Sequence, residues 1–171
     1  MDPMKDSNSI PGFEHSNLSM LVAAARRSLK HAVAPLLDPL DLTPHQAWMI
    51  LLLRETGPLS LTELALRMWL DHPTTSRLVH SLEARNILEV KPDPSHGRRI
   101  KIGICDEGAG FTETLYMASE TFRERMEFGL SPAEKDSFRL ILRKILHNLD
   151  GMNAAAPKRK GSLKGRGVDV D

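Results

Sequence analysis

Two short stretches of this sequence place hydrogen-bond donors where they could bind phosphates or the edges of nucleic-acid bases. The first lies within 72–85, and its polar side carries Pro73, Thr74, Ser76, Arg77 and His80. An arginine guanidinium can donate two parallel hydrogen bonds to guanine or bind a phosphate, and short hydroxyl side chains permit a close approach. The second stretch, 93–99, holds Arg98 and Arg99 in a turn-forming sequence, where a mobile arginine could enter a minor groove.

Each stretch also has an ordinary structural explanation. Thr74 and Ser76 could be only a helix-start cluster, with Arg77 a solvated charge. The segment 93–99 could equally be a polar hairpin turn. The two stretches would have to share one face of a small domain, so each strengthens the binding interpretation of the other.

The formal net charge of +1 is unevenly distributed. Residues 71–101 hold six Lys and Arg against four Asp and Glu, or +2, and residues 154–171 hold five against two, or +3. The remainder is therefore −4. Basic charge gathered in one central segment and one tail is typical of a nucleic-acid-binding protein with a modest total charge.

Length and composition exclude several classes of protein. With 171 residues and 41% hydrophobic residues, the chain can form one compact domain plus tails. No apolar run approaches the roughly 18 residues of a membrane helix, and the first ten residues lack the apolar core of a secretory signal. Cys105 is the single cysteine, which excludes an intramolecular disulfide and a multi-cysteine zinc site. We expect a cytoplasmic protein without a membrane partner.

Long amphipathic helices are predicted at both ends of the chain. Apolar residues recur every 3.6 positions from about Asn17, so a helix should run from there to near Pro39. A second long helix should begin at Asp106 or Glu107. A capping box at 131–134 predicts the start of the last helix, which should end near Gly151.

The elements that must position the two polar stretches lie between these helices. Thr43 and Pro44 predict the cap and first residue of a helix that Gly57 and Pro58 end. A short helix should follow, opened by Thr62 and Glu63 and ending at Met68. After a turn at 69–71, a second helix is expected at 72–85. A hairpin of 87–91 with 99–104 should come last. This order predicts a helix-turn-helix followed by a wing, in which the second helix enters the major groove.

The stretch from Leu42 to Gly108 resembles the MarR family. The matching pieces are LTPHQAWMILLL (42–53), GPLSLTELALRM (57–68), DHPTTSRLVHSLEARNILEV (71–90), PDPSHGRRIKIGI (92–104) and DEG (106–108). No single piece is specific, but their order, spacing and extent cover nearly the whole DNA-binding core of that family.

The resemblance implies a homodimer that binds palindromic double-stranded DNA, usually as a repressor released by a small organic effector. Its first and last helices would interleave in the dimer interface. Position by position, the groove-facing set would be Pro73, Thr74, Ser76 and Arg77, with Arg98 as the wing arginine. An effector pocket is implied between the dimer helices and the winged domain, and Arg27, Trp48 and Met117 are guesses for its lining.

Three positions depart from the family pattern. The wing has His96-Gly97-Arg98 where Asp-x-Arg is usual, and Asp93 could substitute for the missing aspartate. Trp69 occupies a turn position that is commonly glycine, and a tryptophan tolerates a positive φ poorly. Ser81 replaces a basic residue often found one turn after Arg77.

Together these observations predict a mainly α fold: a winged helix-turn-helix with a short two- to three-stranded wing sheet and long N- and C-terminal dimerisation helices. The expected divisions are a flexible arm at 1–12, the N-terminal dimerisation helix at 13–41, the DNA-binding domain at 42–106, C-terminal dimerisation helices at 107–151, and a disordered basic tail at 152–171.

The expected function is sequence-specific DNA binding, and the alternative is a winged-helix protein-interaction module with weak or lost DNA binding. No nucleophile has a plausible base, and the histidines show no metal-ligand spacing, so we expect no enzyme, cofactor or metal site. Cys105 should be a small half-buried residue at the end of the hairpin and not a redox sensor.

Overall fold

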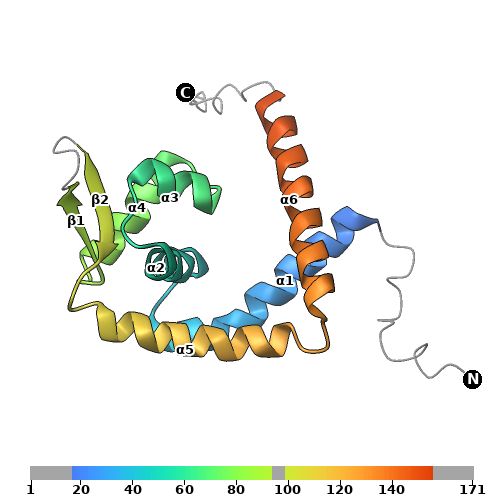
Figure 1. The fold of residues 1–171 in the computed structure, drawn as a ribbon, viewed down its shortest axis with the longest axis horizontal. Coiled ribbons are helices and arrows are strands. Elements are labelled where there is room, and N and C mark those ends of the chain that lie inside the picture. The colour runs from blue at the N-terminus through green and yellow to red at the C-terminus, as the bar shows by residue number, and fades with distance from the viewer. Residues whose placement is uncertain (1–16, 94–98, 156–171) are drawn as a thin grey trace, which may run out of the picture. The chain divides into compact units, whose positions relative to one another are not determined.

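The computed structural model describes residues 17–93 and 99–155. Its elements are α1 (Leu18–Leu37), the 3-10 helix η1 (Asp38–Leu40), α2 (Pro44–Thr56), α3 (Leu61–Met68), α4 (His72–Glu83), β1 (Leu88–Pro92), β2 (Ile100–Ile104), α5 (Ala109–Met126) and α6 (Pro132–Ala155) (Figure 1). The chain forms two compact units, one ending at Met126 and one beginning at Glu127. The expected arm at 1–12, the wing tip at 94–98 and residues 156–171 of the expected tail lie outside the described residues.

The N-cap predicted for α2 is confirmed, and α1 also begins at a side-chain cap. The Asn17 side chain accepts a hydrogen bond from the backbone of Met20 at the start of α1. Thr43 and Gln46 form a reciprocal capping box at the start of α2, and Gly57, with φ of 76°, ends that helix. Glycine adopts this left-handed region without the steric cost that a Cβ atom would bring.

The start of α3 differs from the prediction. Thr62 and Glu63 were expected to open this helix, whereas Ser60 is the N-cap and Leu61 the first helical residue. The Ser60 hydroxyl accepts from the backbone N–H of Glu63, and the Glu63 carboxylate accepts from the backbone N–H of Ser60 at 2.7 Å. This box satisfies two helix-terminal donors at once, which an opening at Thr62 would leave unpaired.

The wing is an antiparallel hairpin in which Leu88 pairs with Ile104 and Pro92 with Ile100. Leu59 adds a single bridge to Ile102, with N–O distances of 3.0 and 2.7 Å in the two directions. The predicted two- to three-stranded sheet is therefore confirmed, with the third strand reduced to one residue.

Helix α5 begins at Ala109 and not at Asp106 or Glu107, because a tight turn comes first. The backbone N–H of Gly108 donates to the carbonyl of Cys105. A Cβ atom at Gly108 would lie 2.4 Å from the carbonyl oxygen of Ile87, so only glycine fits this approach.

Helix α6 confirms the predicted capping box, since Ser131 and Glu134 exchange hydrogen bonds at its start. Its end differs from the prediction, because the helix continues through Gly151 to Ala155. Residues 152–155 are therefore helical, whereas they were expected to belong to a disordered tail. A glycine costs a helix interior only about 1 kcal/mol, which neighbouring helical residues offset.

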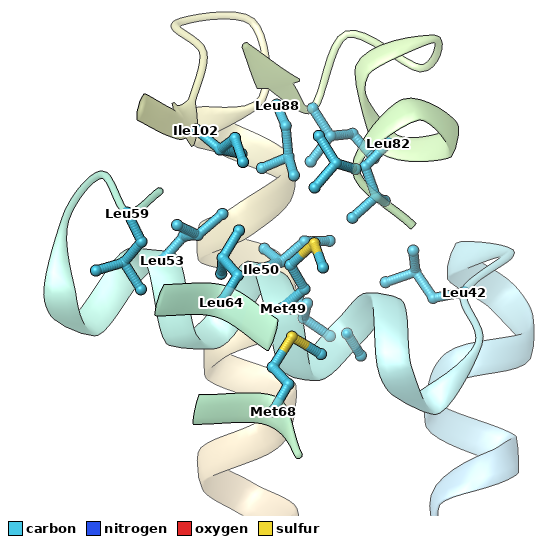
Figure 2. Close-up of a cluster of buried hydrophobic side chains, with 14 of the residues drawn as sticks. Leu42, Met49, Ile50, Leu53, Leu59, Leu64, Met68, Leu82, Leu88 and Ile102 are labelled. Carbon is cyan, nitrogen blue, oxygen red and sulfur yellow. The ribbon is translucent and has the colours of Figure 1, made fainter. Parts of the chain in front are cut away.

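The core of the first unit is built around α2, which contacts α1, α3, α4, α5 and β2. Figure 2 shows Met49, Ile50 and Leu53 of α2 among apolar side chains from the other elements. Leu64, Leu82 and Ile102 are almost fully buried in the same cluster. This packing fixes α3, α4 and the wing to one scaffold. Among the helices at 17–93 and 99–155, none has both the length and the apolar character needed to cross a bilayer.

Candidate nucleic-acid interface

Helix α4 starts on a charged cap. The Asp71 carboxylate accepts a hydrogen bond from the backbone N–H of Thr74 at 2.7 Å. The hydrogen bonds from Thr74 lower the pKa of the Asp71 carboxyl, and the nearby charges of Arg77 and His72 lower it further. Pro73 lies in the first turn, where the missing N–H has no helical partner to lose.

The two sides of α4 differ as the sequence predicts. Its inner side buries Thr75, Val79 and Leu82 against the core. The side chains proposed to contact DNA, which we call the α4 face, are Pro73, Thr74, Ser76, Arg77 and His80. All are exposed except Thr74, which is half-buried.

The Arg77 guanidinium lies on the first turn of its own helix. Its Nε donates to the Pro73 carbonyl at 3.3 Å, and a terminal nitrogen donates to Thr74 Oγ1 at 3.5 Å. Both bonds are long, so they hold the side chain weakly. A base edge or phosphate could replace them at little cost.

Polar contacts hold α4 to the first turn of α2, and the residues after α4 to the end of η1. Gln46 Nε2 donates to Ser81 Oγ at 2.9 Å. Arg85 donates to the carbonyls of Asp41 and Leu40 at 2.6 and 3.0 Å. Ser81 therefore has a structural partner at the position where a basic residue was expected from the family pattern.

An ion pair joins the wing to α3. Lys101 Nζ of β2 lies 3.0 Å from the Glu63 carboxylate. The hydrogen bonds from Ser60, together with the one from Lys101, lower the pKa of Glu63 to about 2. Glu63 thus caps α3 and positions β2 with the same carboxylate.

Of the two arginines predicted for the wing, the structure describes Arg99. Arg99 is exposed beside β2, and its carbonyl accepts from the backbone N–H of Asp93 at 2.7 Å. Arg98, together with His96 and Gly97, lies outside the described residues.

The turn between α3 and α4 keeps a left-handed conformation although it carries a tryptophan. Trp69 has φ of 55° and ψ of 39°, and its backbone N–H caps α3 by donating to the carbonyl of Leu66. Its side chain is 52% exposed. The turn geometry that glycine would provide is therefore present, despite the steric cost to a residue with a Cβ atom.

The three residues guessed for an effector pocket are all exposed, and they lie on three different helices. Arg27 is on α1, Trp48 on α2 and Met117 on α5. None of them lines either of two surface hollows in the first unit. One hollow, of about 350 Å³, lies between the end of α2 and the start of α5. The other, of about 410 Å³, lies beside Arg85 and Gln46.

The sequence analysis did not single out Thr112, whose hydroxyl lies at the hollow between α2 and α5. The Thr112 hydroxyl is buried without a hydrogen-bond partner among the described residues, and Thr112 lines the hollow. Nearby, Arg54 pairs with Glu113 at 2.9 Å and stacks 3.4 Å from the centre of the Tyr116 ring. The sequence carries no pattern that would single out Thr112, because its isolation depends on packing.

Cys105 is buried, and its thiol donates to the carbonyl of Asn86 at 2.9 Å. It is thus more deeply enclosed than the half-buried residue expected. Within the described ranges, no three His, Cys, Asp or Glu side chains are grouped as metal ligands.

A short helix, a tight turn, a second helix with an exposed polar face and an antiparallel hairpin define a winged helix-turn-helix DNA-binding domain. Comparison with known proteins agrees. The MarR family model matches residues 40–99. The HTH-type transcriptional repressor NicR of Pseudomonas putida is 28% identical over 109 residues, which are 64% of this chain and 68% of that protein.

Solved structures share the fold. One describes the regulation of DNA binding of Bordetella bronchiseptica BpsR by 6-hydroxynicotinic acid; it has a TM-score of 0.65 and 24% identity, and the match covers 76% of this chain and 93% of that one. The S. aureus MepR–DNA complex has a TM-score of 0.68 and 21% identity, covering 78% and 96%. Over residues 40–99 the chain thus matches the MarR family, and it shares the winged-helix fold of the solved structures.

Proposed function

We propose that this chain acts as a cytoplasmic homodimer that represses transcription by binding a palindromic operator and leaves it when a small organic effector binds. DNA-binding regulation is the activity of its family. The observation that best supports DNA binding is the α4 face. It presents hydrogen-bond donors to solvent on a helix whose other side is buried in the core.

The proposed roles follow from position on the domain. Arg77, with Thr74 and Ser76 beside it, would contact base edges in the major groove, where an arginine can bind guanine with two hydrogen bonds. Pro73 permits a close approach, and His80 lies one turn further along the same face. Arg98 and Arg99 would contact the adjacent minor groove or its phosphates.

Exposed apolar side chains on the terminal helices support the homodimer. In the single chain, Phe138, Ile141 and Leu149 of α6 are about half exposed. Leu18 and Met20 of α1 are 67% and 60% exposed. Exposed apolar side chains on a helix are a feature of protein–protein interfaces, and a second copy could cover those of each helix.

The effector proposal rests on the relatives. The BpsR structure names 6-hydroxynicotinic acid as the regulator of that protein's DNA binding. In this chain, Arg27, Trp48 and Met117 remain the proposed lining, and the hollow at Thr112 is a second candidate position. We propose no catalytic role, since the relatives named above are regulators.

The wild-type chain can be tested by binding to a duplex selected from a random-sequence pool and to a scrambled duplex of the same composition. Affinity should fall steeply between 50 and 200 mM salt, by about 10³-fold if six phosphates are neutralised. An interaction module that has lost DNA binding would bind neither duplex at low salt, and that result would reject the proposal.

A further inference from the structure

Trp69 combines a strained backbone conformation with a large exposed side chain. Its φ of 55° is unfavourable for a residue with a Cβ atom, and strain of this kind is retained mainly where function requires it. Its side chain is 52% exposed, so burial does not compensate for the strain. Glycine would provide the same turn without strain. The large ring therefore needs an explanation outside the folded chain.

The position of Trp69 indicates which surface the ring meets. Trp69 lies three residues before His72, the first residue of α4, so their Cα atoms are at most about 11 Å apart. The major groove is about 12 Å wide. If the first turn of α4 enters that groove, Trp69 is near enough to reach one of the bordering sugar-phosphate strands.

The surroundings of Trp69 suit a nucleic-acid backbone. Arg67 and His72, two and three residues away along the chain, are exposed and basic, and Arg77 is close enough to lower the pKa of Asp71. Leu66, one turn earlier on α3, is 77% exposed. Two apolar side chains cannot supply the roughly 800 Å² per partner that a stable protein interface buries. A single contact to the DNA backbone needs no such area.

We propose that Trp69 is a positioning residue for DNA: its indole N–H donates to a backbone phosphate at the edge of the major groove while its ring packs on the neighbouring sugar. This inference rests on the proposed DNA-binding function. Phosphate contacts of this kind set the register of the protein on the duplex and carry no sequence information. Trp69 would thus hold α4 at the depth where Arg77 reaches the bases.

The test compares Trp69→Gly and Trp69→Asn with the wild type, because glycine and asparagine both accept the left-handed turn. The probes are a duplex selected by the wild type from a random pool and its scrambled form. Both variants should bind both duplexes about tenfold more weakly, equivalent to ~1.4 kcal/mol. The dependence on salt should be unchanged, since indole is uncharged and releases no counterion. Leu66→Ala, a neighbouring apolar truncation, is the matched control and should bind like the wild type.

Fluorescence and melting separate this role from a structural one. The chain has two tryptophans, so Trp48→Phe leaves Trp69 as the single reporter. Its emission should change when the selected duplex saturates the protein, and Trp69→Gly should melt at or above the wild-type temperature. Full affinity in both Trp69 variants, or unchanged Trp69 emission at saturation, would overturn the inference while leaving the proposed function intact. Failure of the wild type to bind any duplex would overturn both.

Discussion

Gln46 Nε2 donates a 2.9 Å hydrogen bond to Ser81 Oγ, which joins the first turn of α2 to the last turn of α4. Gln46 is 9% exposed, and its Oε1 also accepts from the backbone N–H of Thr43. One side chain therefore caps α2 and fixes the helix that carries the α4 face.

Ser81→Ala should lower the free energy of unfolding by about 1 kcal/mol, because it leaves the buried Gln46 amide with an unpaired donor. Ser76→Ala is the matched control, since it makes the same change on the same helix at an exposed serine that does not bond to Gln46. Urea denaturation should show a lower midpoint only for Ser81→Ala, whereas DNA binding should weaken only for Ser76→Ala. Equal midpoints would show that the Gln46 contact contributes nothing.

Glu63→Gln should flatten the loss of stability in acid. The pKa of Glu63 is about 2 in the folded chain against its usual 4.5, so its contribution is present above pH 4.5 and is lost as the pH falls towards 2. Glutamine can keep the capping box with Ser60 but has no charge to titrate. Melting temperatures from pH 5 to 2.5 should therefore fall less for Glu63→Gln than for the wild type. Glu55→Gln, an exposed change on α2, should follow the wild type.

Particular residues show which features of the fold and of the candidate site could be predicted from the sequence. The Thr43 cap and the capping box at 131–134 depend on neighbours in the chain, so the local pattern was sufficient to predict them. The box at 60–63 has the same signature, but the sequence analysis predicted that Thr62 and Glu63 open this helix. Polar periodicity was enough to predict which side of α4 is exposed.

Contacts between distant residues could not be predicted in this way. The Gln46–Ser81 and Lys101–Glu63 pairs join positions 35 and 38 residues apart, and they meet only because α2 packs on α4 and α3 on β2. The late start of α5 likewise depends on the close approach of Gly108 to Ile87. The sequence showed that Trp69 departs from the glycine common in the MarR family. It did not show that the turn would keep its left-handed conformation with a tryptophan there.

Phe138→Glu should prevent self-association. Phe138 is 58% exposed on α6 in the single chain, so a charge there would be buried without a partner in any interface that covers it. Sedimentation should give twice the 19.1 kDa chain mass for the wild type and the single-chain mass for the variant. The adjacent exposed change, Ser137→Glu, should leave the dimer intact. A wild type that sediments as a monomer contradicts the homodimer.

Arg98→Ala should weaken binding to the selected and scrambled duplexes by similar factors. A wing arginine contacts phosphates or follows groove width, and neither contact identifies a base pair directly. Competition assays on duplexes with narrow and wide flanking minor grooves would detect the contribution from groove width. A loss confined to the selected duplex would assign Arg98 to base contacts instead.

Arg77→Ala on two duplexes tests the central claim most directly. The Arg77 side chain has only two long hydrogen bonds to Pro73 and Thr74, so its loss should change the free energy of unfolding by no more than about 0.5 kcal/mol. Measured by fluorescence anisotropy, the variant should bind the selected duplex more weakly by roughly 1–3 kcal/mol and the scrambled duplex by much less. If Arg77→Ala binds the selected duplex as tightly as the wild type, the α4 face does not contact bases through this residue, and sequence specificity must arise elsewhere in the protein.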